Sequence, residues 1–505
     1  MRFAIIYIDI LPTFLFSRFY IIFSIPSLIH ITKYYKFLSH KYRYLNDLIS
    51  LSAKNKNILY HVDSKKYSYF RRMNKLLSCI PAPIVIFYFG FLSVFHPGTI
   101  HAISHDSLTH SQNKKGWNIT PLPEIAYNSD LGFQYGIYCE LYNFGNGSNY
   151  PNYTHKLCTE VAQFTKGSGV YWFFYDSPQL WKNHRLSFDI AYLPDKMCDF
   201  YGYNGLPAPY SKSQNNSFYK IDRKQIRAIF GLQGKIAGNL NWMAGISWQK
   251  MMIGPVTDKK YADAENLYNL YIDAGLIHKN EAKGGNVLQW KAGIVYDTRD
   301  READPTRGMY GEAIVAFSPD WIDRNGYSFI RTTLCISYYQ PLWREYLTLA
   351  GRIGSQFTPF GKVPFYFLSD INTYYIRQTY SEGLGGISSL RGILRNRIVG
   401  NGIGWTNIEL RLRSKVIRLL KQNWYIGMNP FIDAGTVLQS YRSKLQKESN
   451  NPIIYSGKNE KVHVSAGIGL KLVMNHNFVL SAEWGKAFNR EDGSSSIDLG
   501  VNYLF

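Results

Sequence analysis

The chain has 505 residues and carries 57 lysines and arginines against 36 aspartates and glutamates, a net charge of +21. Its mean hydropathy of −0.22 excludes a bundle of membrane helices, which are far more apolar. Aromatic residues make up 16% of the chain. This composition fits a transmembrane β-barrel, which hides its apolar residues by alternating them with polar ones, and it also fits a soluble β-sandwich or barrel.

A secretory signal peptide is predicted inside the chain rather than at its start. Lys75 begins a short basic stretch, residues 84–95 form an almost unbroken apolar run, and Ala102 places a small residue at a cleavage position. We therefore interpret residues 73–102 as the signal peptide and residues 1–72 as an upstream extension that is not part of the mature protein. The alternative is that residues 1–72 form a membrane anchor.

The positive charge is concentrated in this N-terminal part. Residues 1–72 hold 12 basic and 3 acidic residues, a balance of +9, and residues 73–102 add one lysine, so that residues 103–505 keep +11 (21 − 9 − 1). A basic rim at the arginines near residue 395 would attract lipopolysaccharide phosphates, although a solvated loop surface is the more common explanation of such charge. No recognition module for nucleic acid accompanies the charge, so we expect no nucleic-acid partner.

Residues 117–505 are long enough for a large barrel. They number 389 (505 − 117 + 1), and a bilayer-crossing strand needs roughly 9–11 residues, so sixteen strands with turns and loops would fill this length. The opening strand is predicted within residues 126–144. Pro121 and Pro123, just ahead of it, are expected to keep the approach out of regular pairing.

Three charged residues in the second half of the chain are placed as if to meet. Arg391 lies in the glycine-rich stretch 385–392, and Glu409 and Asp433 lie in strand-like segments downstream. An arginine held against both carboxylates would form a charge cluster inside a β-barrel. A buried guanidinium is tolerated when it is paired and its hydrogen bonds are made, and it then fixes one loop geometry.

The last fifty residues alternate with a period of two, as strands do. Residues 462–472 place valine, alanine, isoleucine and leucine on one face and polar or small residues on the other. The final strand is predicted to point outward with Ile497, Leu499, Val501, Tyr503 and Phe505. The chain would end on this strand, which must pair with the first one, because an open edge in lipid leaves backbone groups unsatisfied.

These motifs together resemble the BamA/TamA superfamily of outer-membrane assembly barrels, also called the bacterial surface antigen family. Besides the segments around Arg391, Glu409 and Asp433, the resemblance rests on residues 293–308, a strand and turn signature, and on residues 349–352 and 363–365. It extends over most of the chain after about residue 117. It implies an all-β fold, a transmembrane antiparallel barrel of sixteen strands with one loop folded into the lumen.

The resemblance also implies a role for each residue of the cluster. Arg391 and Gly392 match the Arg-Gly tip of the family's lumen loop, and this arginine would clamp the loop against Glu409 and Asp433. The chain departs from the family at Ile393, where a phenylalanine or tyrosine is usual. Two further positions of the Phe-x-Asp-x-Gly strand motif are Phe431 and Gly435. The chain end is similar to the sorting signal of outer-membrane barrels, which here comprises Gly500, Tyr503 and Phe505.

The function implied by the resemblance is assembly or translocation of protein or lipid at the bacterial outer membrane. The implied partners are outer-membrane lipid and lipopolysaccharide, the barrel assembly machinery during biogenesis, and an unfolded client or a periplasmic partner. Residues 103–116 would form a short periplasmic linker with no room for a POTRA domain, as in the barrel-only members of the family.

Two other classes of function stay open. The first is a channel or structural surface protein that uses the same barrel. The second, less favoured, is an outer-membrane enzyme, because the sequence has no Gly-x-Ser-x-Gly elbow, no His-Glu-x-x-His motif and no phosphate-binding glycine loop ahead of a helix. We therefore expect no catalytic site, and no residue cluster indicates a cofactor or a metal.

Overall fold

The computed structural model describes residues 114–128, 132–148, 150, 152–181, 183–215, 217–256, 265–322, 326–373, 383–419 and 422–505. The predicted upstream extension and signal peptide, and nearly all of the predicted linker, lie outside these residues. Those three boundaries remain predictions.

Seventeen strands form one sheet, and all of its described ladders are antiparallel. The strands are β1 (Trp117–Asn128), β2 (Gly132–Asn143), β3 (His155–Phe164), β4 (Gly169–Trp181), β5 (His184–Asp199), β6 (Lys220–Ala237), β7 (Leu240–Gly254), β8 (Gly284–Asp297), β9 (Gly308–Ser318), β10 (Phe329–Trp343), β11 (Leu347–Gly361), β12 (Gly402–Arg413), β13 (Ile417–Leu419), β14 (Gln422–Gln439), β15 (His463–Met474), β16 (Phe478–Ala487) and β17 (Ser495–Val501). The short helices α4 (Leu267–Asp273), α5 (Ser443–Glu448), η2 (Phe365–Phe367) and η3 (Arg490–Asp492) lie in the connections.

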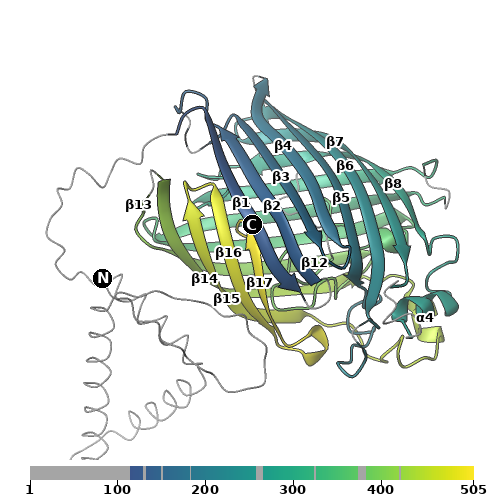
Figure 1. Ribbon diagram of the computed structural model, residues 1–505. Helices are drawn as coiled ribbons and strands as arrows, with labels where there is room; N and C mark the ends of the chain where they lie inside the picture. The colour runs from purple at the N-terminus through teal and green to yellow at the C-terminus, as the bar shows by residue number, and fades with distance from the viewer. Residues whose placement is uncertain are drawn as a thin grey trace, which may run out of the picture. The chain divides into compact units, whose positions relative to one another are not determined.

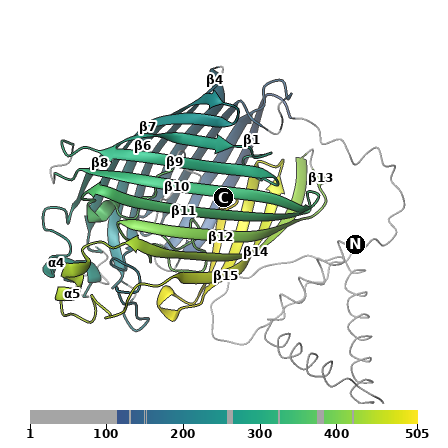
Figure 2. The ribbon, with the colours of Figure 1, turned by 180° about the vertical axis from the view of Figure 1, so that it is seen from behind.

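The sheet is a meander in which each long strand pairs with the next long strand along the chain. The short β13 pairs with β14, as β12 does, so the two segments share one position and the sheet has sixteen positions, as predicted. The sheet curves round, so that β2 to β7 face the viewer in Figure 1 and β9 to β12 in Figure 2. No ladder between β1 and β17 is present among the described residues, and closure of the barrel through these strands remains a prediction.

The polarity of the sheet is inverted relative to a soluble protein. Ile408 of β12 is 51% exposed, whereas its neighbours Asn407 and Glu409 are completely buried. The same alternation runs through β15, where Leu470 and Leu472 are exposed and the lysine between them is buried. Apolar side chains outside and charged side chains inside are typical of a barrel that lies in lipid. Among the described helices, none is long and apolar enough to cross a membrane.

The chain does not end on a strand, which corrects one prediction. Ile497 and Leu499 of β17 point outward as predicted, with 69% and 77% of their surface exposed, but β17 ends at Val501. Asn502 has a left-handed backbone with φ of 71°, a conformation that asparagine tolerates, and it breaks the alternation. Tyr503 and Phe505 are therefore turned inward and are only 2% and 3% exposed.

The first strand also begins earlier than predicted. Residues 117–128 form β1, and Pro121 and Pro123 take part in its ladder opposite Cys139 and Ile137 of β2. The expectation that the prolines prevent pairing was wrong. A strand with a described ladder on one side only tolerates proline, because a missing amide can face the unpaired edge.

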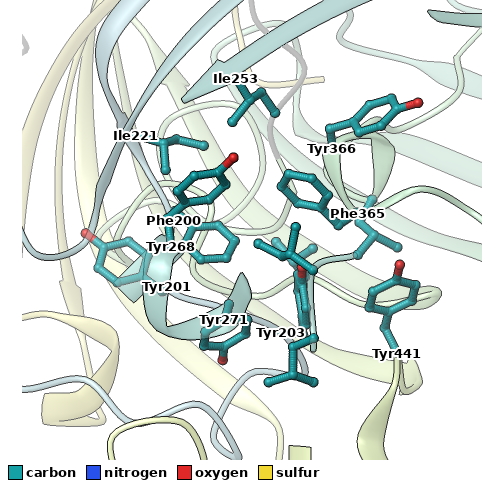
Figure 3. Packing of buried hydrophobic residues seen from close by; sticks show 14 of the residues in the cluster. Phe200, Tyr201, Tyr203, Ile221, Ile253, Tyr268, Tyr271, Phe365, Tyr366 and Tyr441 are labelled. Atoms are coloured by element: carbon teal, nitrogen blue, oxygen red, sulfur yellow. The ribbon is translucent and has the colours of Figure 1, made fainter. Parts of the chain in front are cut away.

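The connections differ in length between the two ends of the sheet. At one end the turns are short, such as residues 344–346 and 475–477. At the other end several connections are long, and four of them meet in an aromatic core. Figure 3 shows Phe200, Tyr203 and Tyr271 converging there with Phe365 and Tyr441. The rings of Tyr203 and Tyr441 meet edge to face with centroids 4.9 Å apart, so these loops form a packed cap.

Candidate functional site

The candidate site lies where the long connection between β11 and β12 turns back into the interior of the curved sheet. Short backbone bridges join Leu384 to Ile398 and Gly386 to Leu390, and these give the returning segment a fixed shape. Leu384, Leu390 and Ile393 are buried in one apolar cluster. Ile393, the position that departs from the family pattern, thus contributes aliphatic packing to the tip.

Arg391 is buried at this tip, between two carboxylates. Its Nη1 lies 2.5 Å from Glu409 Oε1, its Nε and Nη2 each lie 2.8 Å from an oxygen of Asp433, and its backbone N–H also donates to Asp433 at 3.0 Å. The ring of Phe431 lies against the guanidinium, 3.6 Å from Cζ to the ring centroid. Two carboxylates and a π-face offset the cost of burying the cation.

The strand pattern brings the two acids together. β12 and β14 are adjacent, and their register pairs Asn407 with Asp433 and Glu409 with Phe431. Because residues two apart on a strand share a face, Glu409 and Asp433 both point inward beside each other. The structure thus brings together the residues that the sequence analysis grouped.

Two glycines make the close approach of the loop possible. A Cβ on Gly392, whose φ is 82°, would lie 2.4 Å from the backbone carbon of Gly485 on β16. A Cβ on Gly435 would lie 2.8 Å from a methyl carbon of Leu390. Gly392 needs glycine, because a side chain there would separate the loop tip from the backbone of β16, whereas at Gly435 the nearest atoms are leucine methyl groups that can shift.

The cluster is larger than the sequence analysis proposed. Glu483 of β16 lies 3.5 Å from Arg391 Nη1 and pairs with Lys471 of β15, and Arg411 donates to the second oxygen of Glu409 at 2.9 Å. All three residues stand at inward positions of their strands and are buried. A charged residue at an inward-facing strand position was the signal in the sequence that could have identified them.

The inward-turned chain end reaches the same cluster. Arg411 donates to a main-chain oxygen of Phe505 at 2.8 Å, and the rings of Tyr503 and Phe505 lie 4.3 and 5.0 Å from its guanidinium carbon. Gly500 lies beside the loop tip, since a Cβ there would be 3.0 Å from Ile387. The three predicted sorting-signal residues therefore lie near the Arg391 cluster. Their role as a sorting signal remains a prediction.

A family comparison covers the Arg391 cluster and all of the arrangement except the last two residues. The model of the Omp85 superfamily domain matches residues 162–503, which is 342 residues (503 − 162 + 1) and more than half of the chain. The chain belongs to the Omp85 superfamily. Omp85 proteins are transport or assembly proteins of the bacterial outer membrane, and the predicted BamA/TamA-type barrel and its location are thereby confirmed. In outer-membrane barrels the long loops are extracellular and the short turns periplasmic, so the aromatic cap of this Omp85 barrel faces outward.

Solved structures of other barrels are similar to this Omp85 chain. BamA from Haemophilus ducreyi lacking POTRA domains 1–3 is 19% identical, with a TM-score of 0.46 over 77% of this chain and 69% of that one. CdiB from Escherichia coli is 12% identical, with a TM-score of 0.45 over 76% and 61%, and CdiB from Acinetobacter baumannii is 14% identical, with a TM-score of 0.40 over 77% and 60%. No curated protein sequence matches the chain significantly.

Proposed function

We propose that this Omp85 barrel assembles or translocates substrates at the outer membrane, and that Arg391 clamps the lumen loop against Glu409 and Asp433 while it does so. The observation that carries the proposal is the full pairing of a buried arginine at a loop tip with acids from two different strands. Such pairing ties the loop to the wall, and the shape of the lumen then depends on it.

The clamp would act across the strands next to the chain end. The loop tip contacts β12 and β14 through the two acids and approaches β16 at Gly392. Breaking a buried ion pair by removing one partner leaves an uncompensated charge, which costs roughly 3–5 kcal/mol. A held tip would therefore keep the last strands in a fixed position relative to the lumen.

The edges of the sheet support an opening between the first and last strands. β17 has 7 residues, whereas β1 has 12, and the chain end beyond β17 is turned into the lumen. Few backbone hydrogen bonds are then available to join the two edges. A weak junction of this kind would let an extended segment of a client, or a lipid, leave the lumen sideways. The proposed partners are accordingly an unfolded client or a periplasmic partner, with lipopolysaccharide and lipid around the barrel.

The clamp is tested by comparing Arg391→Ala with Arg490→Ala, a substitution at an exposed arginine in η3. We expect Arg391→Ala to lower the temperature at which the barrel loses its fast gel migration, and to lower the amount of other barrels in the outer membrane. The control should do neither. Unchanged barrel stability and unchanged outer-membrane composition in Arg391→Ala would refute the clamp.

The alternative of a channel or surface protein makes a different prediction. A channel would conduct ions across a planar bilayer, and its conductance would be insensitive to added client proteins. The packed aromatic cap over the extracellular end argues for a lumen that is closed at rest. A steady client-independent conductance would favour the channel over the assembly role.

A further inference from the structure

The turn between β8 and β9, residues 298–307, extends from the short-turn end of the sheet as a folded unit. The backbone N–H of Thr298 donates to the carbonyl of Met309 at 2.8 Å, and that of Asp300 donates to Arg307 at 3.1 Å. The Asp300 carboxylate also accepts from the backbone N–H of Thr306 at 2.8 Å. These bonds continue the hairpin past the ends of its strands, so residues 301–305 project as a tip with a fixed direction.

One side of this tip is anchored to β4 and β5. Arg185 of β5 donates to both oxygens of Glu302, at 2.8 and 3.0 Å, and the same guanidinium holds both oxygens of Asp176 on β4 at 2.8 Å. Tyr153 donates to Asp176 at 2.7 Å and completes the anchor. A bidentate pair on each edge of one guanidinium fixes the position of Glu302.

The other side is anchored to β12, β14 and the turn after β15. Asp304 is completely buried, where it pairs with Arg413 and accepts from the hydroxyl of Tyr425. Arg413 also donates to the carbonyl of Pro305 at 3.2 Å. His476 lies 3.0 Å from Arg301 and 3.6 Å from Asp304. The second anchor uses none of the residues of the first.

The two anchors stand on opposite sides of the turn that carries the tip. Along the meander, β5 precedes β8 by three strands, and β12 follows β9 by three. The turn that holds His476 lies further round the curved sheet, after β15. A tip that touches all of these walls lies across the opening of the lumen. It covers a small cavity of about 60 Å³, whose lining includes Glu302, Ala303, Tyr153, Cys158 and Tyr503.

We propose that the β8–β9 turn is a latch that closes the periplasmic mouth of the lumen by joining opposite walls through Glu302 and Asp304, and that both anchors release when a substrate enters. The latch and the aromatic cap then close the two ends of the lumen separately. Two ion-paired anchors fit a reversible closure, because a charged tip that leaves them becomes hydrated instead of exposing apolar surface. The latch does not depend on the assembly role, since its state can be measured without any client.

Cys158 of β3 offers a native probe of the latch. Its thiol is buried, faces the lumen, and lines the cavity under the tip. The experiment uses the full chain with Cys158 as its single cysteine, purified in detergent, and follows the rate of reaction with a small charged methanethiosulfonate reagent. The variants are Glu302→Gln with Asp304→Asn, Asp304→Arg alone, and Asp304→Arg with Arg413→Asp. Arg307→Gln, an exposed position of the same turn, is the control.

We expect slow labelling of the parent and of the control, and labelling about tenfold faster or more when both anchors are removed. Exchanging the charges of Asp304 and Arg413 should restore slower labelling than Asp304→Arg alone. Fast gel migration of the unheated protein identifies the folded fraction, to which the comparison is restricted. A folded double variant that labels at the parent rate, or a charge exchange that restores nothing, would overturn the latch.

Discussion

Arg411 of β12 donates one hydrogen bond to Glu409, at 2.9 Å, and another to the last residue, Phe505, at 2.8 Å. Because Glu409 also holds Arg391, the loop tip and the chain end are joined through a single carboxylate and a single guanidinium. The chain end is thus tied to the candidate site instead of extending β17 along its neighbour. Substitutions at the loop tip should therefore affect the position of the chain end, and substitutions at the chain end should affect the loop tip.

Removing the Arg411 contact should release the chain end. A hydrogen bond to a charged group contributes about 1.5–3 kcal/mol, so Arg411→Gln should raise the population of a free end by roughly tenfold to a hundredfold. The measurement is the rate at which carboxypeptidase removes Phe505 from the folded protein. Arg418→Gln, at an exposed position of β13, is the control. Equal rates in both variants would show that Arg411 does not hold the end.

A side chain at Gly392 should prevent the loop tip from approaching β16 closely. In Gly392→Ala, the added Cβ would meet backbone atoms of Gly485 and Lys486 at 2.4 and 2.5 Å, and the left-handed φ adds strain. We expect a loss of about 1–3 kcal/mol in stability, seen as a lower temperature for the loss of fast gel migration. Gly351→Ala on β11 has open space for its Cβ and should be neutral. If Gly392→Ala and Gly351→Ala lost fast gel migration at the same temperature, the loop tip would not touch β16.

The prolines of β1 should weaken the junction between the first and last strands. Pro121 and Pro123 are two apart, so their nitrogens face the same side, and we expect this to be the free edge. Pro121→Thr with Pro123→Thr would add two donors there, each worth about 0.5–1.5 kcal/mol once paired.

The expected result of this double variant is a more heat-resistant barrel that opens less readily and supports less substrate assembly. Ile119→Val, at an exposed position of the same strand, controls for surface effects. A drop in heat resistance would instead place the proline nitrogens toward β2, where added side chains and amides disturb an existing ladder.

The stability that the second anchor of the latch contributes should depend on pH. Burial alone would raise the pKa of the Asp304 carboxyl, but Arg413 beside it, helped by His476, Arg301 and Tyr425, holds this pKa below its usual value. A lowered pKa means that the anchor stabilises the fold above about pH 4, the pKa of an unfolded aspartate, and that this stability is lost as pH falls through the folded pKa.

The measurement for this anchor compares the unfolding free energies of the parent and Asp304→Asn at pH 7 and at about pH 3. The difference should be roughly 3–5 kcal/mol at neutral pH, because a buried Arg413 would lose its charged partner, and it should shrink in acid. His476 faces Asp304 at 3.6 Å, so His476→Gln is measured in parallel. A difference that does not change with pH would contradict the role of the charged carboxylate.

The strands could be predicted from sequence, because their apolar and polar residues alternate with a period of two. Glu409 and Asp433 lie in strand-like segments, so they could be grouped with Arg391 from the residues, and the resemblance then supplied the role of each. The chain end could not be predicted in this way, because one left-handed residue, Asn502, reversed the direction of Tyr503 and Phe505. Residues 293–308 were recognised as a strand and turn, but the contacts of this turn with Arg185 and Arg413 join segments more than a hundred residues apart. No local pattern carries that information.

The most direct test of the assembly role is the insertion of an unfolded outer-membrane barrel client into liposomes that contain the purified protein. The account predicts that the client becomes protease-resistant faster than in empty liposomes, and that Arg391→Ala, compared as folded protein, removes this acceleration while Arg490→Ala keeps it. Equal insertion in the presence and absence of the protein, together with a steady client-independent conductance, would contradict the assembly role and favour a channel.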